Sequence, residues 1–389
     1  MKRMFAAFLA VWSLFALSGC GAPPSPEPPA PPVQEEAPEP PPPEPVEPPL
    51  PEPPVDPVEE LLGSMSLAQQ VGQLFFVRCP AENAAEDVST YHLGGYILFG
   101  RDTKEKSAGE LMQTIQSYQN SAAIPLLIGV DEEGGSVVRV SSNPNLRSQR
   151  FSSPQKLYAQ GGMEQVIADT HEKDALLKVL GFNVNLAPVA DVSTDPADFI
   201  HARTFGQNAS ATAAYTAAVT AQMTLDGMGS VLKHFPGYGS NADTHTGVAV
   251  DQRPYEDFVN GDFLPFSAGL EGGGAATAVL VSHNIVECMD DALPASLSPA
   301  VHRILRQELS FDGVAMTDDL AMEAVSAYAG DGAVAVMALE AGNDLVITSD
   351  YRSQIPKVIE AVETGALSGE VIQTACRRVL RWKQALGLL

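Results

Sequence analysis

The sequence predicts an α/β fold, a single domain in which eight parallel strands close into a (β/α)8 TIM barrel. Short apolar runs rich in Val, Ile, Leu and Phe recur along residues 58–389, helix-forming stretches separate them, and polar residues end most of them. Strands that alternate with helices are typical of a parallel sheet, and eight of them favour a closed barrel over an open sheet. A segment of roughly 330 residues also lies within the size range of one such barrel.

The expected strands are short, and each is separated from the next by enough chain for a helix. In chain order they cover residues 74–79, 95–99, 125–131, 182–191, 229–234, 278–283, 313–318 and 344–348. The expected helices between them cover residues 107–119, 164–180, 210–226, 297–309 and 331–341.

Polar residues stand at the carboxyl ends of five of these eight runs. In a barrel all these ends lie on one face, where active sites are built. A single charged residue at a strand end is an ordinary terminator, but a repeated choice of Asp, His or Lys favours a shared polar pocket. The residues in question are Asp131, Asp191, Lys233 with His234, His283 and Asp318.

The start of the chain is typical of a targeting segment. Lys2 and Arg3 precede an apolar stretch, residues 5–17, that is too short for a stable membrane span. Leu-Ser-Gly-Cys at 17–20 resembles the lipobox of bacterial lipoproteins, which implies cleavage after residue 19 and a lipid on the Cys20 thiol. The alternative is an ordinary secretory signal. We therefore expect a signal peptide over 1–19 and a protein lipid-anchored to the cell membrane on its extracytoplasmic face.

Residues 20–57 are expected to form a disordered Pro/Glu-rich linker behind the lipidated cysteine. Residues 21–60 hold 19 prolines, 10 acidic residues and no basic one, a composition that cannot bury a core. The whole chain has a net charge of -25 and no basic patch, so nucleic acid is excluded as an expected partner. The three later cysteines, Cys79, Cys288 and Cys376, show no paired spacing typical of a zinc site or disulfide framework.

The loop over residues 233–245 gathers two histidines, a lysine and an aspartate in a segment broken by Pro236 and two glycines. Asp243 and His245 are two residues apart, so in a turn the carboxylate can reach and orient the imidazole. A histidine held in this way carries protons near neutral pH. The alternative is a polar surface loop with incidental histidines.

Asp318 and Asp319 stand side by side at the end of the seventh run. Neighbouring strand residues point to opposite faces, so only one of the two can face the pocket while the strand persists. A buried pair would repel and raise one pKa. The alternative is that both acids cap a helix that begins near Ala321.

These motifs together resemble those of the bacterial β-N-acetylhexosaminidases of glycoside hydrolase family 3. The most specific are KHFPG at 233–237, followed by DTH at 243–245, and TDDL at 317–320. The similarity spans residues 60–389, so the catalytic barrel is expected over 58–389. Further matches are GGYILF at 94–99, DEEGG at 131–135, NLAPVADV at 185–192 and RTFG at 203–206.

The resemblance implies a retaining exo-β-N-acetylglucosaminidase that acts on peptidoglycan fragments or chito-oligosaccharides through a covalent glycosyl-aspartate. It implies that Asp318 is the nucleophile and that His245, tuned by Asp243, is the acid/base. It also implies no metal and no organic cofactor, and Glu132 replaces a glutamine that is common in the family. The residues implied to bind the sugar are Asp131, Arg139, Arg203, Lys233 and His234.

Two other functions stay open from the sequence. One is a β-glucosidase or β-xylosidase of the same broad family, whose members usually take a carboxylate acid/base from a second domain; the histidine loop argues against it. The other is a non-catalytic, lipid-anchored protein that binds the cell wall on a degenerate barrel, which the presence of both Asp318 and His245 disfavours.

Overall fold

The computed structural model describes residues 25–26, 28–33, 56–239, 249–322, 325, 328 and 333–389. The chain divides into two units, Met1–Pro53 and Pro54–Leu389. In the first unit the described residues are exposed and have no regular secondary structure. All helices and strands described below belong to the second unit.

Seven parallel strands form the main sheet, in the order β1-β2-β3-β6-β7-β9-β11. The fold is therefore α/β with a parallel sheet, as predicted. Seven of the eight expected runs supply these strands. Their bounds are β1 Phe76–Arg78, β2 Gly95–Leu98, β3 Leu127–Val130, β6 Val184–Asn185, β7 Gly229–Phe235, β9 Thr277–Val281 and β11 Ala315–Thr317.

The eighth expected run, residues 344–348, contributes isolated bridges instead of a regular strand. The Val346 N–H donates to the Leu74 carbonyl at 2.7 Å, and the Phe76 N–H donates to the Val346 carbonyl at 3.0 Å. On its other side, the Thr317 N–H donates to the Leu345 carbonyl at 3.1 Å. The sheet is therefore curled, because one segment bonds both to β11 and to the chain at β1.

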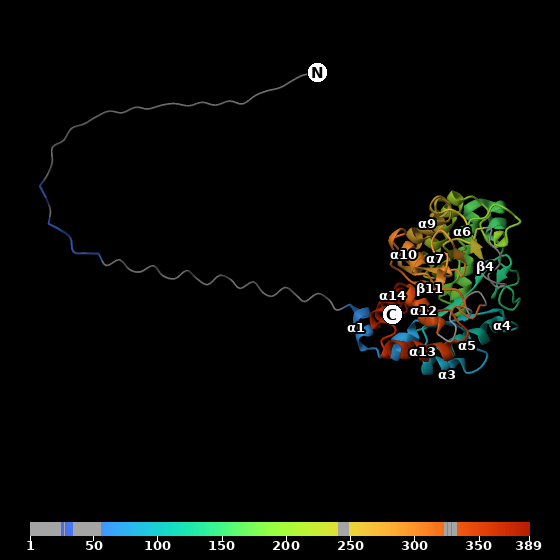
Figure 1. Ribbon diagram of the computed structural model, residues 1–389, viewed down its shortest axis with the longest axis horizontal. Helices are drawn as coiled ribbons and strands as arrows, with labels where there is room; N and C mark the ends of the chain where they lie inside the picture. The colour runs from blue at the N-terminus through green and yellow to red at the C-terminus, as the bar shows by residue number, and fades with distance from the viewer. Residues whose placement is uncertain are drawn as a thin grey trace, which may run out of the picture. The chain divides into compact units, whose positions relative to one another are not determined.

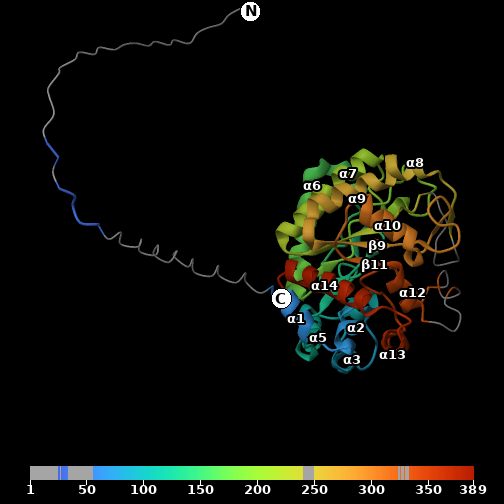
Figure 2. The ribbon, with the colours of Figure 1, turned by 60° about the vertical axis from the view of Figure 1, so that its left-hand side comes forward.

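Helices lie around this sheet. In Figure 2, α7, α9 and α10 lie on one side of β9 and β11, and α12, α13 and α14 lie on the other. The longer helices are α1 Pro57–Ser64, α2 Leu67–Gln73, α3 Ala84–Tyr91, α5 Ala108–Ser121, α6 Pro154–Leu180, α7 Ala209–Asp226, α9 Phe263–Gly273, α10 Pro299–Gln307, α12 Val334–Ala341, α13 Tyr351–Glu363 and α14 Gly369–Ala385 (Figure 1). Among the residues that the structure describes, no helix is both long and apolar enough to cross a membrane.

Short elements complete the unit. The short helical turns are α4 Gly100–Thr103, α8 Tyr255–Asp257, η1 His201–Arg203, η3 Phe258–Asp262, η4 Gly274–Ala276 and η5 Ala295–Leu297. Two small sheets stand apart from the main one: β4 Glu132–Gly134 pairs antiparallel with β5 Val137–Val138, and β8 Val250–Asp251 pairs parallel with β10 Ile285–Val286.

Local sequence explains where the helices begin and end. Ser107 opens α5 with a capping box completed by Glu110. Helix α6 starts ten residues before the expected position 164, because the Ser153 side chain caps it and Pro154 occupies its first turn. The chain kinks inside α6 at Gly161 and Gly162, which is why the hydrophobic period predicted only its second half.

The strands are buried on both faces, as expected for a parallel sheet covered by helices. Gly129 of β3 shows how tightly the interior is filled, since a Cβ there would lie 2.4 Å from the Phe76 ring. This packing holds the carboxyl ends of β1, β3, β7 and β11 close together, and Arg78, Asp131, Lys233 and Asp318 stand at those ends.

Candidate active site

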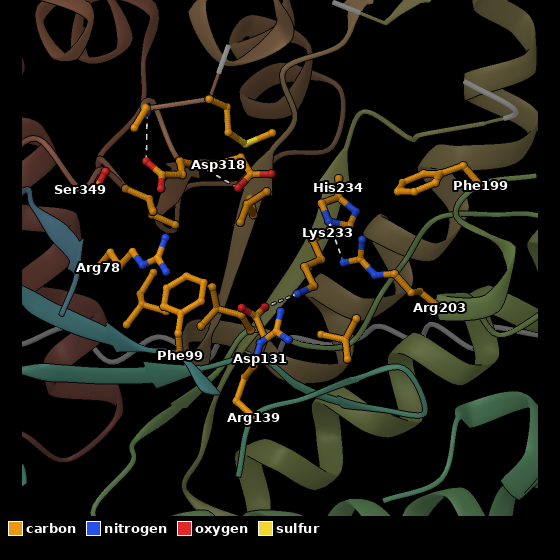
Figure 3. Close-up of a pocket in the computed structure, with 18 residues that line it drawn as sticks. Arg78, Phe99, Asp131, Arg139, Phe199, Arg203, Lys233, His234, Asp318 and Ser349 are labelled. Carbon is orange, nitrogen blue, oxygen red and sulfur yellow. Dashed lines mark hydrogen bonds and ion pairs between the residues drawn. The ribbon is translucent and has the colours of Figure 1, made fainter. Parts of the chain in front are cut away.

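A pocket of about 670 Å³ opens at the carboxyl ends of the strands (Figure 3). Six of the residues predicted from the sequence line it: Asp131, Arg139, Arg203, Lys233, His234 and Asp318. Asp243 and His245 fall in the segment 240–248, and Cys20 near the start of the chain, all outside the described residues. The structure therefore brings together the predicted nucleophile and all five predicted sugar-binding residues.

Lys233 is held between two carboxylates. Its Nζ lies 2.7 Å from Asp131 Oδ1 and 2.6 Å from Glu133 Oε1, and its side chain is 3% exposed. Burial alone would raise the pKa of Glu133, but Lys233 and Arg203 together lower it to about 2. The lysine ammonium and the Glu133 carboxylate therefore both stay charged inside the protein.

Arg203 completes this buried network. Its Nε and Nη2 donate to the two oxygens of Glu133 at 3.0 and 2.8 Å, a bidentate arrangement that fixes the guanidinium plane. Its Nη2 also lies 3.2 Å from His234 Nε2. Because arginine can only donate, His234 Nε2 accepts, and the His234 proton lies on Nδ1, 2.7 Å from Asp191 Oδ2. In this arrangement both ring nitrogens are engaged, and His234 orients Arg203.

Asp191 bonds to the backbone that precedes positions 240–248. Its Oδ1 accepts the Tyr238 N–H at 2.7 Å, and its Oδ2 accepts the backbone N–H of His234 at 3.1 Å. Where the chain returns, Arg253 bonds to both Asp251 and Asp262. The described residues on either side of positions 240–248 are thus each held by buried carboxylates.

The β4–β5 hairpin brings Arg139 to the pocket. The buried Glu132 carboxylate accepts the N–H groups of Arg139 and Val140, both at 2.7 Å, and that of Ser141 at 3.1 Å. The turn requires Gly134, whose φ is +101° and whose Cβ would lie 2.3 Å from the Ser152 carbonyl oxygen. Glu132 therefore shapes the hairpin, and its charge is turned away from the pocket toward backbone donors.

Asp318 and Asp319 both line the pocket. The prediction that only one of them faces the pocket assumed that the strand continues through both residues. Strand β11 ends at Thr317, so that assumption does not hold. The Asp319 N–H donates to Asp318 Oδ1 at 2.8 Å, while Asp319 Oδ1 accepts the Ala321 N–H at 3.0 Å. Asp319 thus caps the following turn and Asp318 is left toward the pocket.

The two carboxyls have opposite pKa shifts. Burial would raise the pKa of Asp318, but His283, the Asp319 N–H and Lys233 hold it below its usual value. Burial raises the pKa of Asp319, and the Asp318 charge adds to that effect. The raised pKa of Asp319 is the shift expected for a repelling pair, and Asp318 is the member with the lower pKa.

His283 bonds to the turn that carries Asp318 and Asp319. Its Nδ1 lies 2.7 Å from Ser296 Oγ, and its Nε2 lies 3.1 Å from the Asp319 carbonyl oxygen. Since the carbonyl can only accept, Nε2 carries a proton and donates it to the Asp319 carbonyl. His283 therefore holds the backbone that carries the two carboxylates.

Sequence reasoning missed several residues of the site. Glu133 was part of a recognised motif, but nothing in its local sequence shows that it joins Lys233 and Arg203. Arg78 and Phe99 stand at the ends of the first two strands and line the pocket, but neither is one of the Asp, His or Lys residues that mark the other strand ends. Phe199 lines the pocket on an irregular segment and is 45% exposed.

The arrangement has the parts that a reaction at a sugar carbon needs. It places one ionised carboxylate in a concave pocket, with rigid, paired cations and carboxylates that can exchange hydrogen bonds with hydroxyl groups. An ionised, oriented carboxylate can act as a nucleophile.

Comparisons with known proteins agree with this chemistry. Residues 66–382 match the glycosyl hydrolase family 3 N terminal domain. Beta-hexosaminidase LpqI of Mycobacterium tuberculosis is 32% identical over 306 residues, covering 77% of this chain and 76% of that protein. The beta-hexosaminidase of Methylococcus capsulatus is 33% identical over 282 residues, covering 71% and 81%.

A solved structure shows the same fold. The glycoside hydrolase family 3 beta-N-acetylglucosaminidase from Paenibacillus sp. str. FPU-7 superposes with a TM-score of 0.77 at 30% identity. The match covers 84% of this chain and 63% of that one, so the chain spans less than two thirds of this neighbour. By the extent of the family match and the identity to its members, the chain belongs to glycoside hydrolase family 3 and is a glycosidase.

Proposed function

We propose that this protein is a retaining exo-β-N-acetylhexosaminidase that removes terminal β-linked N-acetylglucosamine from peptidoglycan fragments or chito-oligosaccharides. The observation that carries the proposal is the Asp318 carboxylate, kept ionised at a pocket lined by paired sugar-binding groups. The names of the relatives, β-hexosaminidase and β-N-acetylglucosaminidase, support the 2-acetamido sugar as substrate.

In the proposed reaction Asp318 attacks the anomeric carbon and forms a covalent glycosyl ester, while His245 donates a proton to the departing glycosidic oxygen. Water then attacks the same carbon, His245 removes its proton, and Asp318 leaves, so the configuration is retained. Asp243 orients the His245 imidazole. Such general acid/base catalysis contributes about 10²- to 10⁴-fold in rate.

Binding of the sugar is assigned to the groups around Asp318. Asp131 accepts from hydroxyl groups, Lys233 and Arg203 donate to them, and Arg139 reaches the pocket from the hairpin. His234 contributes by holding Arg203. Because Lys233 and Arg203 are already paired, they enter the complex with little further loss of side-chain freedom.

We also propose that residues 58–389 form a closed (β/α)8 barrel, which the hydrogen bonds of segment 344–348 to both neighbours support. Residues 1–19 would be removed as a signal peptide, and a lipid on Cys20 would hold the enzyme, through the linker up to residue 57, on the extracytoplasmic face of the cell membrane.

Variants of the two catalytic residues test the function. Asp318→Asn keeps the side-chain shape, so it is expected to lose more than about 10³-fold in kcat on nitrophenyl N-acetyl-β-glucosaminide while still binding N-acetylglucosamine. His245→Ala is expected to lose most on substrates with poor leaving groups. Wild-type rates in both variants, or faster hydrolysis of the corresponding β-glucoside by the wild type, would contradict the proposal. Product configuration, followed by NMR, tests retention.

A further inference from the structure

Arg78 is a charged residue of the pocket to which the proposed reaction gives no role. It ends β1, lines the pocket and is partly buried. Its Nε is buried without a hydrogen-bond partner, and the guanidinium forms no hydrogen bond or ion pair within the described part of the chain. Its contact is with the face of Phe99, whose ring centre lies 4.4 Å from the Arg78 Cζ.

Two of the three other cations of the pocket are paired, whereas Arg139, whose Nε is likewise buried without a hydrogen-bond partner in the described part of the chain, reaches the pocket from the β4–β5 hairpin. Lys233 is paired with Asp131 and Glu133, and Arg203 is paired with Glu133. Arg78 lies close enough to Asp319 and Asp102 to interact with both electrostatically, but it forms an ion pair with neither. Asp319 is bonded to the Ala321 N–H, and Asp102 is bonded to the Phe99 N–H and paired with Arg101. A partly desolvated guanidinium without a hydrogen bond or ion pair favours an anion that arrives from outside.

Arg78 lies apart from Lys233, His234 and Arg203, and Asp131 and Arg139 lie between Arg78 and these three residues (Figure 3). Figure 3 shows Lys233, His234 and Arg203 on one side of Asp318, and Arg78, Phe99 and Ser349 on the other. A sugar held by the first group with its anomeric carbon at Asp318 therefore has its leaving group toward the second. N-acetylglucosamine carries no charge, so an anion that meets Arg78 belongs to the aglycone.

We propose that Arg78 and Phe99 form a subsite for a carboxylate on the aglycone sugar, such as an ether-linked lactate. The planar guanidinium binds a carboxylate through two parallel hydrogen bonds, and Phe99 holds that plane in place. Ser349, which also lines the pocket, supplies a hydroxyl beside it. This assignment rests on the proposed exo-β-N-acetylhexosaminidase function and names the class of substrate that Arg78 selects.

The test compares one disaccharide with and without its charge. The substrates are N-acetylglucosaminyl-β-1,4-N-acetylmuramic acid and its methyl ester, which lacks the lactate charge and carries one additional methyl group. We expect wild-type kcat/KM to be about 10- to 100-fold higher for the acid, mainly through KM. The ratio is expected to fall to about 1 in Arg78→Met and to recover in part in Arg78→Lys. Arg303→Met, at an exposed arginine outside the pocket, is expected to keep the wild-type ratio.

Either of two results overturns the subsite: a wild-type enzyme that does not distinguish acid from ester, or an Arg78→Met variant that still prefers the acid. Binding separates this question from the proposed function. Calorimetric titration of the Asp318→Asn variant, with and without Arg78→Met, measures the same preference without turnover. If no substrate is hydrolysed, the glycosidase proposal fails, and the titration still decides whether Arg78 binds the carboxylate.

Discussion

At the scale of single residues, Glu133 decides the geometry of the pocket. Its two oxygens bind Lys233 and Arg203, residues that come from different parts of the chain, and its side chain is 3% exposed. Neither cation has the freedom of a surface side chain, because the shared carboxylate fixes both. The sugar-binding groups are therefore arranged before any sugar arrives.

We predict that Glu133→Gln lowers the free energy of unfolding by about 3–5 kcal/mol, because the buried cations Lys233 and Arg203 lose the carboxylate that they share. We also expect KM to rise, because Lys233 and Arg203 lose their common anchor. Urea denaturation and steady-state kinetics measure the two effects.

Glu172→Gln is the matched control. Glu172 pairs with Arg147 at 2.8 Å, but its side chain is 61% exposed. Such a surface pair contributes about 0–1 kcal/mol. Equal destabilisation by the two substitutions would show that Glu133 does not act as a buried anchor.

At the scale of elements, the contact between α6 and α7 contains an acid with an unusual environment. Asp174 of α6 is fully buried, and neither carboxyl oxygen has a hydrogen-bond partner among the described residues. Burial raises the pKa of Asp174 to about 8, and the nearby Asp226 carboxylate adds to the shift. The protonated acid is therefore the form that fits between these helices.

This shift predicts a dependence of stability on pH. From pH 3.8, the ordinary pKa, to about 8, the folded protein holds a proton that the unfolded chain releases. The contribution of Asp174 to the free energy of unfolding therefore falls as pH rises, by up to about 1.4 kcal/mol per pH unit. Asp174→Asn cannot ionise, so its stability relative to the wild type is expected to rise across this range. Urea denaturation at a series of pH values measures this difference.

Asp291→Asn, at an exposed position, is the control. Its free energy of unfolding is expected to differ from that of the wild type by the same amount at every pH. A constant difference between Asp174→Asn and the wild type at all pH values would show that Asp174 titrates normally.

The elements also show which parts of the fold can be predicted from local sequence. Strands such as β2 and β9 were predicted because a buried parallel strand is a continuous apolar run. Helices α5 and α7 cover the stretches expected to be helical and begin at the side-chain caps of Ser107 and Asn208. The β4–β5 hairpin was not predicted, because its strands are too short and polar to differ from a loop, and Glu132 stabilises it only through bonds formed after folding.

At the scale of the whole molecule, the described pocket belongs entirely to the unit Pro54–Leu389. The attachment proposed for Cys20 belongs to the other unit. We predict that Cys20→Ser moves the protein from the membrane fraction to the soluble fraction of its host and leaves kcat unchanged. Fractionation followed by activity assay measures both.

Cys288→Ser provides the control, since Cys288 is a free and exposed cysteine of the second unit. It is expected to leave the protein in the membrane fraction. Membrane association that persists in Cys20→Ser would show that something other than a lipid on this thiol holds the protein.

The sequence by itself determined the alternation of strands and helices, the side of the sheet that carries the polar residues, and six residues of the pocket. The alternation and the residues Asp131, Lys233, His234 and Asp318 follow from local patterns, namely apolar runs and the type of residue at each strand end, whereas Arg139 and Arg203 follow from the family resemblance. Only the tertiary structure decided which charges meet. Glu133 and Arg203 are 70 positions apart, and segment 344–348 pairs with the chain at β1 and with β11. Such pairs arise from the curl and register of the sheet, which no local stretch of sequence contains. For the same reason Arg78 could be identified as a cation without a partner only once the sheet had placed its neighbours.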